Sequence, residues 1–510
     1  MAKPIKRKTT TTQYIALIAA PVLSLLIILF VDLEPGNKNV TYTFAIAILM
    51  AIWWVTEAIP LAATALLPVA LFPLLGVVDG KTISAMYFNH LIFLFIGGFL
   101  MALAMERWNL HRRIALKILI TFGVSPGRIL MGFMLGTSVL SMWMSNTATA
   151  MMMIPIAMSI ILKLEENLGK KKMGKYSIGL LLGIAYSASI GGIATLVGTP
   201  PNLSFARIIS IVFPNVPEIS FANWIMFALP VSVLMFAAAW LLLYFMYKPK
   251  KKWKKLSKED FRDEYHNLGK AKPEEKIVFS LFIILALLWI FRSGFDFQFI
   301  KIPGWAEIFE APSYINDGTV AIFIALLLFI IPSPTEKGDR IMDWPTARKI
   351  PWRIVLLFGG GFALAKGFVD SGLSLWFGES LSGLASVSPI FLTLIIVAMM
   401  SFLTELTSNT ATTEMILPIL AGLSVSIHVN PLLLMVPATL AGSLAFMLPV
   451  ATPPNAIVFG TGHLQIKDMV RTGFILNLIG IIIATLMMYF WGTAVFGIEQ
   501  GVFPDWAINP

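Results

Sequence analysis

Long apolar segments follow one another along nearly the whole chain and are separated by short polar connections. Two of them read YIALIAAPVLSLLIILFV (14–31) and IVFSLFIILALLWIF (277–291). A run of about twenty apolar residues is long enough to cross a bilayer as a helix. Because the runs are continuous and do not alternate with polar residues, they do not fit the strands of a membrane β-barrel. The pattern predicts an all-α polytopic membrane protein.

The apolar segments divide into about eleven transmembrane helices. We expect these over residues 14–32, 41–57, 60–78, 91–107, 177–212, 222–247, 276–292, 314–332, 352–369, 432–462 and 470–496. Two apolar stretches remain, 126–162 and 388–428, and a run of polar residues interrupts the centre of each. We expect each to form a re-entrant hairpin, which enters and leaves the membrane on one side.

The composition supports a membrane protein and excludes several kinds of site. Of the 510 residues, 57% are hydrophobic and only 13% are charged, whereas about a quarter of the residues of an ordinary soluble domain are charged. The chain has no cysteine, which excludes disulfides, thiolate metal sites and cysteine nucleophiles. No histidine spacing points to zinc. GGGF (359–362) lacks the rest of a phosphate loop, so its glycines indicate close helix packing.

The net charge of +10 is concentrated in the polar connections. The densest patch, residues 248–276, is interpreted as a basic cytoplasmic loop; a lipid or partner site there is the alternative, and no nucleic acid is expected as a partner. With a cytoplasmic N-terminus and two re-entrant hairpins, the cytoplasmic segments contain 32 of the 38 Lys and Arg. These segments are 1–13, 107–128, 163–176, 248–276, 333–353 and 463–471. The bias predicts an odd number of spans in the plasma membrane and an extracellular C-terminus.

Two polar motifs occur twice in the chain. SNTATAMMMIPI (145–156) matches SNTATTEMILPI (408–419), and GTPPN (198–202) matches ATPPN (451–455). The SNT runs lie at the centres of the two expected hairpins. Each TPPN lies within an expected span and follows its SNT run at a similar distance. The duplication predicts two structural repeats.

A third pair of segments extends the repeat, because FIGGFLMALAMERWNL (95–110) matches FGGGFALAKGFVDSGL (358–373). We assign the first repeat element to residues 80–212 and the second to 352–462. An odd number of crossings separates equivalent elements, so the two halves are expected to be inverted relative to each other. Inverted repeats are typical of secondary transporters.

The SNT runs place hydroxyl and amide groups where lipid cannot hydrogen-bond them. They could pair across helices, but their duplication favours convergence on a solute. The TPPN runs have a related logic, because two adjacent prolines remove two backbone donors and disfavour helix before them. A helix break at membrane depth exposes carbonyls and a helix N-terminus, and it persists where it lines a cavity. A simple proline kink is the alternative.

The four motifs together are rich in oxygen and contain no Lys or Arg. Hydroxyl, amide and backbone carbonyl oxygens suit a hard cation such as Na⁺, and Asn and Thr donors could bind carboxylate oxygens. Arg207 and Lys366 are nearby in sequence and are expected near the outer surface.

These motifs resemble those of the divalent anion/sodium symporter family, whose bacterial members include sodium–dicarboxylate transporters. The resemblance covers nearly the whole chain and rests on WWVTEAIPLAATALLP (53–68), IFLFIGGFLMALAMERWNLH (92–111), SNTATAMMMIP, IGGIATLVGTPPN (190–202), FLTELTSNTATTEMILP (402–418) and MLPVATPPNAIVFG (447–460). It implies a homodimer and an elevator-like movement of the hairpins and broken helices. Ala194 and Ala451 stand where the family pattern favours glycine.

The resemblance also implies specific site residues. The first sodium site would comprise Ser141, Ser145, Asn146 and the Gly198 carbonyl. The second would comprise Thr404, Ser408, Asn409 and the Ala451 carbonyl. The substrate carboxylates would lie on Asn146, Thr147, Ser408, Asn409 and Thr410, framed by Thr199, Pro200, Thr452 and Pro453.

Three acids lie in or near apolar runs, where acidic side chains are commonly functional. We expect Glu57 and Glu405 to pair with a hydroxyl or a backbone donor, with proton coupling as the alternative. Glu414 receives no role. HRRIALK (111–117) is expected to form an amphipathic helix on the inner surface.

The sequence therefore predicts a Na⁺-coupled symporter that imports C4-dicarboxylates such as succinate, fumarate or malate with at least two Na⁺. Inward movement of a dianion against a negative-inside potential costs about 4.6 kcal/mol per 100 mV, and co-transported Na⁺ offsets this cost. Another anion, such as citrate or sulfate, and obligate dicarboxylate exchange remain open. An intramembrane enzyme or a channel is the competing class, but no acid–base or metal constellation supports an enzyme.

Overall fold

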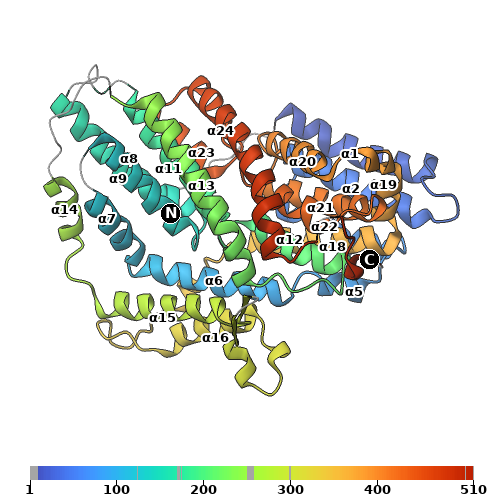
Figure 1. Cartoon of the computed structure of the whole chain (residues 1–510), viewed down its shortest axis with the longest axis horizontal. Coiled ribbons are helices and arrows are strands. Elements are labelled where there is room, and N and C mark those ends of the chain that lie inside the picture. Colours follow the sequence, from blue (N-terminus) through green and yellow to red (C-terminus); the bar gives the residue numbers. More distant parts are fainter. Residues whose placement is uncertain are drawn as a thin grey trace.

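The structure is a computed structural model that describes residues 10–122, 125–168, 173, 175–249, 258–297, 300–499 and 501–508. The named elements of the described part are helices, apart from a short antiparallel hairpin of β1 (Phe295–Phe297) and β2 (Ile300–Ile302) (Figure 1). The basic residues 1–9 and residues 250–257 of the 248–276 patch lie outside the described residues.

Helices of very different lengths make up this fold. The N-terminal half contains α1 (Thr11–Phe30), α2 (Lys38–Thr56), α3 (Leu61–Thr64), α4 (Leu67–Leu74), α5 (Gly80–Ala85), α6 (His90–Arg107), α7 (Leu110–Phe122), α8 (Pro126–Ser141), α9 (Asn146–Leu168), α11 (Tyr176–Gly192), α12 (Pro200–Val212) and α13 (Phe221–Tyr247). The C-terminal half contains α14 (Lys258–Asn267), α15 (Pro273–Ile290), α16 (Asp317–Ile330), α17 (Trp344–Ala347), α18 (Trp352–Ser371), α19 (Leu373–Ser380), α20 (Pro389–Leu403), α21 (Asn409–Ser426), α22 (Pro431–Ala441), α23 (Pro453–Gly460), α24 (Ile466–Met487) and α25 (Thr493–Val495). Single turns are η1 (Trp305–Ile308), η2 (Pro312–Tyr314), η3 (Ser382–Ser386), η4 (Met488–Gly492) and η5 (Asp505–Ala507).

The predicted polytopic helical fold is confirmed, and each predicted span has a helical counterpart. Within the described residues, seven helices are long and apolar enough to cross a membrane by length and composition. Further apolar helices of 10–17 residues include α11, α16, α20 and α22. The short helices occur mainly where polar motifs or prolines interrupt a span.

Two segments differ in detail from the expectation. The span predicted over 60–78 is divided into α3 and α4, because Pro60 precedes the first helix and Pro68 stands in the first turn of the second, where its missing N–H leaves no hydrogen bond unmade. The expected basic loop 248–276 contains the helix α14.

The amphipathic helix expected at HRRIALK is α7. It buries Leu110, His111, Ala115, Leu116 and Leu119 on one face. Arg112 and Lys117 on the opposite face are exposed. The three- and four-residue spacing of the buried positions is that of a helix lying on a surface.

Glycines allow the closest helix contacts in the fold. A Cβ on Gly97 of α6 would overlap Ala321 of α16, and a Cβ on Gly191 of α11 would overlap the Ser138 backbone of α8. In α18, Gly359 faces Tyr87 and Gly360 faces Ala65. The interpretation of GGGF as a packing motif is therefore confirmed.

The buried apolar side chains form one large core and a smaller one. The smaller core contains buried side chains of α2, α4, α5 and α18, together with Leu373 of α19 and Ala411 of α21. α1 lies outside both cores, packs along α2 and exposes apolar side chains such as Ile15, Ile18 and Phe30. In a membrane protein this face contacts lipid.

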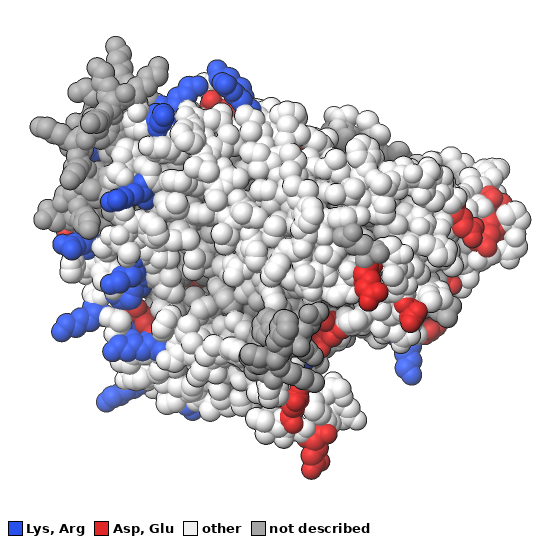
Figure 2. Space-filling view, in the orientation of Figure 1, with Lys and Arg blue, Asp and Glu red and all other residues white. Residues whose placement is uncertain are grey.

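Charged residues are distributed unevenly over the surface. Figure 2 shows Lys and Arg gathered at one end of the visible face and Asp and Glu toward the other. By comparison with Figure 1, α7 and α14 lie at the basic end, and α5 and α19 lie toward the acidic end.

Candidate binding site at the helix breaks

Both SNT runs interrupt a pair of helices. The helix α8 ends at Ser141 and α9 begins at Asn146; α20 ends at Leu403 and α21 begins at Asn409. The serine of each SNT therefore precedes the first residue of the second helix. The amide and threonine side chains of the motif project from the first turn, which is the electropositive end of a helix.

Both TPPN runs begin a helix after a break. Pro200 is the first residue of α12 and Pro453 the first residue of α23, where a missing backbone N–H leaves no hydrogen bond unmade. The preceding threonines are extended and nearly identical in conformation, with φ −142° and ψ 140° at Thr199 and φ −140° and ψ 148° at Thr452. The predicted helix breaks are confirmed.

The asparagine side chain of each TPPN forms hydrogen bonds that stabilise the adjacent helix break. Asn202 Nδ2 donates to the carbonyls of Thr195 (2.7 Å), Ile193 (3.2 Å) and Gly192 (3.4 Å). Asn455 Nδ2 donates to the carbonyls of Leu448 (3.1 Å) and Ala445 (3.2 Å). Both asparagines are fully buried. The sequence motifs include these two asparagines but did not predict this role for them.

Three oxygens meet at the first predicted sodium site. Ser141 Oγ is 2.6 Å from Asn146 Oδ1 and 2.7 Å from the Ala188 carbonyl oxygen of α11. A hydroxyl has one proton and can serve only one of these acceptors at a time. The cluster therefore contains more lone pairs than protons, which is the character of a site for a hard cation.

Glycine makes room for this cluster. A Cβ on Gly192 would lie 2.6 Å from Asn146 Oδ1, and a Cβ on Gly198 would overlap the Gly192 carbonyl. The structure thus brings Ser141 and Asn146 together, and Gly192 lies against both Asn146 and Gly198. The sodium site that the family resemblance implies here stays a prediction. Ala188 and Gly192 were not predicted, because their contribution is made by the backbone.

The remaining residues of the first motif surround the start of α9. Ser145 Oγ accepts the backbone N–H of Ala148 (3.1 Å), so this hydroxyl caps the helix. Thr147 is partly buried. The sequence did not single out Thr149, which is buried and whose Oγ1 has no hydrogen-bond partner among the described residues.

The second predicted sodium site has fewer mutual contacts. Thr404 is fully buried and its hydroxyl donates to the Ser401 carbonyl (3.2 Å). Asn409 Oδ1 is buried and receives no hydrogen bond within the described residues. Ser408 caps α21 without a side-chain hydrogen bond. These oxygens fit a cation, and no hydrogen bond joins them to one another among the described residues.

The other predicted residues lie at the two breaks. Thr199, Thr410, Ala451 and Thr452 are buried, whereas Pro200 is partly buried and Pro453 is exposed. Their roles in substrate binding stay predictions.

Glu405 anchors the second break to the second SNT hairpin. Its carboxylate accepts the backbone N–H groups of Phe446 (2.6 Å), Met447 (2.9 and 3.0 Å) and Leu448 (3.0 Å), and also the Asn477 amide (2.8 Å). The expected pairing with backbone donors is confirmed. The pairing expected for Glu57 stays a prediction.

The first repeat makes the equivalent connection with different groups. There the Thr195 hydroxyl donates to the Met142 carbonyl and accepts the Gly198 N–H (3.1 Å). A hydroxyl-to-backbone contact in one repeat thus corresponds to a carboxylate-to-backbone contact in the other.

Around the breaks, helices of one repeat pack against helices of the other. The helix α12 of the first repeat packs against α21 and α22 of the second, and α23 of the second packs against α9 and α11 of the first. Each helix that follows a TPPN therefore lies beside the SNT helix of the other repeat.

The cations near the motifs differ in their partners. Lys366 pairs with Asp370 (2.7 Å). Arg207 donates to Ser210 Oγ (3.4 Å) and has no ion pair among the described residues. Neither contacts an SNT or TPPN side chain through a hydrogen bond within that part of the chain.

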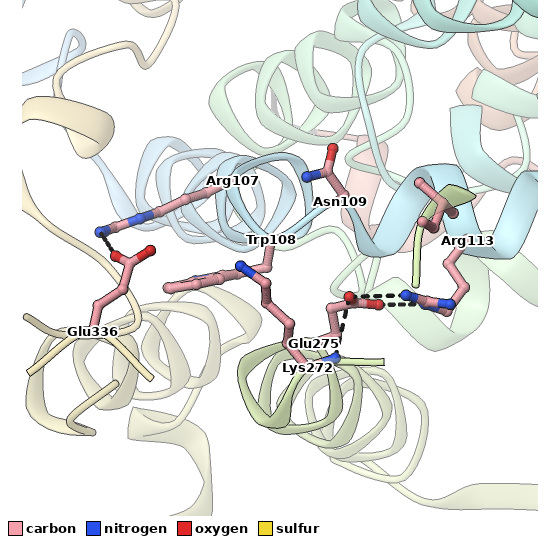
Figure 3. Close-up of a pocket in the computed structure, with 8 residues that line it drawn as sticks. Arg107, Trp108, Asn109, Arg113, Lys272, Glu275 and Glu336 are labelled. Atoms are coloured by element: carbon pink, nitrogen blue, oxygen red, sulfur yellow. Dashed lines mark hydrogen bonds and ion pairs between the residues drawn. The ribbon is translucent and has the colours of Figure 1, made fainter. Parts of the chain in front are cut away.

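A cavity of about 140 Å³ lies apart from these motifs, at the junction of α6 and α7 (Figure 3). Both arginines of its lining face acids: Arg113 faces Glu275, whose carboxylate also accepts the Lys272 backbone N–H (3.3 Å), and Arg107 points toward Glu336. The Glu275 carboxyl raises the pKa of Arg113, whose guanidinium therefore stays charged. The two arginines of this pocket are therefore already balanced by acids.

Comparison with known proteins decides the family. A family model for the transmembrane region of sodium:sulfate symporters matches residues 8–498. The chain belongs to the sodium:sulfate symporter family.

Two close relatives are named sodium-dependent dicarboxylate transporter SdcS. The chain is 45% identical to the Staphylococcus saprophyticus protein over 96% of this chain and 93% of the relative. It is 46% identical to the protein of Staphylococcus aureus strain MRSA252 over 97% of this chain and 94% of the relative.

Two solved structures share the fold. MtrF of Neisseria gonorrhoeae, described with a class of antimetabolite efflux pumps, aligns over 96% of this chain and 99% of its own with a TM-score of 0.59 and 12% identity. The YdaH transporter of Alcanivorax borkumensis aligns over 98% of both chains with a TM-score of 0.53 and 12% identity.

Proposed function

We propose that this protein is a Na⁺-coupled symporter that imports C4-dicarboxylates such as succinate, fumarate and malate. The observation that carries the proposal is the identity of 45% to a sodium-dependent dicarboxylate transporter along 96% of the chain. The two duplicated, uncharged oxygen motifs support it, because they supply ligands for Na⁺ without supplying fixed positive charge.

The electrostatics explain why sodium is required. A dianion gains little from a site built of hydroxyls and amides, and its inward movement costs about 4.6 kcal/mol per 100 mV of negative-inside potential. Two bound Na⁺ neutralise the dianion and offset this cost. A third Na⁺ would make import electrogenic. Sodium therefore binds first and completes the anion site.

We assign the sites as the motifs imply. Na⁺ at the first site is held by Ser141, Ser145, Asn146 and the Gly198 carbonyl, and Na⁺ at the second by Thr404, Ser408, Asn409 and the Ala451 carbonyl. The substrate carboxylates bind to Asn146, Thr147, Ser408, Asn409 and Thr410, between Thr199–Pro200 and Thr452–Pro453. The lone-pair excess around Ser141 supports this assignment, and so does Asn409 Oδ1, which receives no hydrogen bond among the described residues.

We further propose that the repeat elements 80–212 and 352–462 are inverted, and that their hairpins and broken helices move together as the transport unit. The remaining helices, α18 among them, anchor it, and two copies form a homodimer. The basic end seen in Figure 2 supports a cytoplasmic N-terminus and an extracellular C-terminus. Movement of the unit across the membrane is the elevator step.

Purified protein in proteoliposomes tests the function. Labelled succinate uptake should depend on an inward Na⁺ gradient and be negligible when K⁺ replaces Na⁺. Robust uptake in K⁺ would overturn the coupling. Currents far above carrier turnover would instead indicate a channel, and chemical conversion of the substrate would indicate an enzyme.

The substrate class is tested by counterflow. Vesicles preloaded with succinate, fumarate, malate, citrate, sulfate or 2-oxoglutarate are compared for their ability to drive uptake of labelled succinate. We expect the C4-dicarboxylates to be the most effective. A preference for sulfate, after which the family is named, or uptake only into preloaded vesicles, would replace the C4-symport assignment with sulfate transport or obligate exchange.

A further inference from the structure

The carboxyl group of Glu414 is buried between three helices and makes one hydrogen bond within the part of the chain that the structure describes. Its side chain is fully buried on α21, Oε1 accepts the Ser204 hydroxyl of α12 at 2.9 Å, and Oε2 has no partner among the described residues. Gly361 of α18 lies directly against it, since a Cβ there would overlap the carboxyl carbon and Oε2. The carboxyl therefore lies where α21, α12 and α18 meet.

This position is one helical turn from the proposed substrate site on two helices. On α21, Glu414 follows Thr410 by four residues, and on α12, Ser204 follows Pro200 by four residues; such pairs lie on one helix face. Gly361 lies midway along α18, a helix long enough to span the membrane. Glu414 thus faces an anchoring helix from the side of the proposed transport unit, near the depth of the substrate.

Charged and titratable groups on the surrounding elements are engaged elsewhere or make no bond to Glu414. They are Arg207 on α12, Arg353, Lys366 and Asp370 on α18, Glu379 on α19, Lys38 and Tyr42 on α2, and Tyr87 after α5. Lys366 pairs with Asp370, Arg207 donates to Ser210, and the Tyr87 hydroxyl donates to the Ala65 carbonyl. Within the described residues, none of the eight forms an ion pair or hydrogen bond with Glu414.

The contrast with Glu405 indicates the protonation state. Glu405 is also buried, but three backbone N–H groups and the Asn477 amide donate to it, which suits a carboxylate. Glu414 receives one neutral hydroxyl. A buried ion without a partner is strongly disfavoured in a membrane, whereas a protonated carboxyl is neutral. Because Oε2 lies directly against Gly361, a metal ion with several ligands does not fit beside it. A proton is small enough to fit.

We propose that Glu414 is a proton-binding site, and that transport requires its proton. The inference rests on the proposed function, because it assigns α21 and α12 to a unit that moves past α18. With the proton bound, the surface facing Gly361 is neutral and can slide. When the proton is lost, a negative charge is left at this interface, one turn from the site of the dianion, and it opposes both movement and anion binding.

A pH profile of uptake tests the requirement. Fumarate is the substrate, because it stays a dianion throughout the range from about pH 6 to pH 10, in which buried carboxyl groups titrate. At saturating Na⁺, wild-type uptake should fall about tenfold per pH unit on the alkaline side, the slope of a single proton. Glu414→Gln, which stays neutral, should match wild type at acidic pH and remain flat. Glu379→Gln, an exposed acid on the adjacent helix, is the control and should follow wild type.

The proton itself is tested without transport. An infrared spectrum of wild-type protein near neutral pH should contain the carbonyl stretch of a buried protonated carboxylic acid, and Glu414→Gln should lack it. A wild-type spectrum without that band, a flat wild-type profile, or an alkaline loss retained in Glu414→Gln would overturn the proposal. Absence of any Na⁺-dependent uptake by wild type would instead refute the proposed function, and the infrared comparison would still decide whether Glu414 binds a proton.

A second variant covers the case in which Glu414→Gln does not fold. Ser204→Ala keeps the carboxyl and removes the one hydrogen bond that it makes among the described residues. Because that bond favours the ionised form, the midpoint of the alkaline loss should move to higher pH. A profile that coincides with wild type would overturn the proposal.

Discussion

The backbone N–H of Met447 donates to both carboxylate oxygens of Glu405, at 2.9 and 3.0 Å. Because Phe446 and Leu448 donate to the same carboxylate, three successive residues of the second helix break are fixed to the residue that follows Thr404. The proposed second sodium site therefore depends on a side chain that need not touch the ion.

Replacement of Glu405 by Gln should weaken sodium coupling at this site. The amide presents one oxygen and an NH₂ group to three N–H donors, and a buried donor without an acceptor costs about 1–3 kcal/mol. We expect the Na⁺ concentration for half-maximal uptake to rise about tenfold or more, which corresponds to about 1.4 kcal/mol. Sodium titration of succinate uptake measures it. Glu379→Gln should leave the value unchanged, and an unaltered value in Glu405→Gln would contradict the anchoring role.

Asn202 and Asn455 should each be required for a folded break, and the replacement chosen should matter. Their amides donate to two or three backbone carbonyls, and each lost hydrogen bond costs about 1 kcal/mol. Alanine should lower the melting temperature and reduce uptake. Aspartate should be worse than alanine, because its carboxylate would face the same carbonyl oxygens. Thermal unfolding in detergent measures the order, and an aspartate variant as stable as wild type would show that these contacts do not hold the break.

Removal of either SNT amide should nearly abolish transport without preventing folding. Asn146→Ala and Asn409→Ala are each expected to lower uptake roughly a hundredfold, about 2.7 kcal/mol, because each removes a ligand proposed to serve both Na⁺ and substrate. Asn223→Ala, outside the motifs, is the matched control. Size-exclusion chromatography checks folding, and wild-type uptake in either SNT variant would remove that residue from the site.

The parts of this site visible in the sequence are those made by repeated side chains. SNT and TPPN could be recognised because polar groups and paired prolines are rare in apolar spans, and the structure places both at helix breaks. The contributions of Ala188 and Gly192 could not be predicted. Ala188 contributes its backbone carbonyl, which every residue type has, and Gly192 contributes only the space left by a missing Cβ.

The repeated motifs could not predict contacts between distant segments, for a different reason. The tie between Thr195 and Met142 corresponds to the tie between Glu405 and the segment after Ala445, but the two use unrelated residue types. A comparison of the two repeats finds similar residues. It therefore misses equivalent contacts that the two repeats make with different residue types. The sequence also gave no role to Glu414, because its hydrogen-bond partner Ser204 lies in the other repeat and no motif connects the two residues.

Gly192→Ala provides the sharpest test of the oxygen cluster, because it changes no polar group. A Cβ there would lie 2.6 Å from Asn146 Oδ1, so the amide must move away from Ser141. We expect weaker Na⁺ dependence, with half-saturation raised about tenfold, and little change in expression. Gly383→Ala is the control, since a Cβ at that position meets no atom within 4 Å. If Gly192→Ala keeps wild-type sodium dependence while Asn146→Ala loses transport, Asn146 acts through the substrate alone, and the first sodium site must be built from other oxygens.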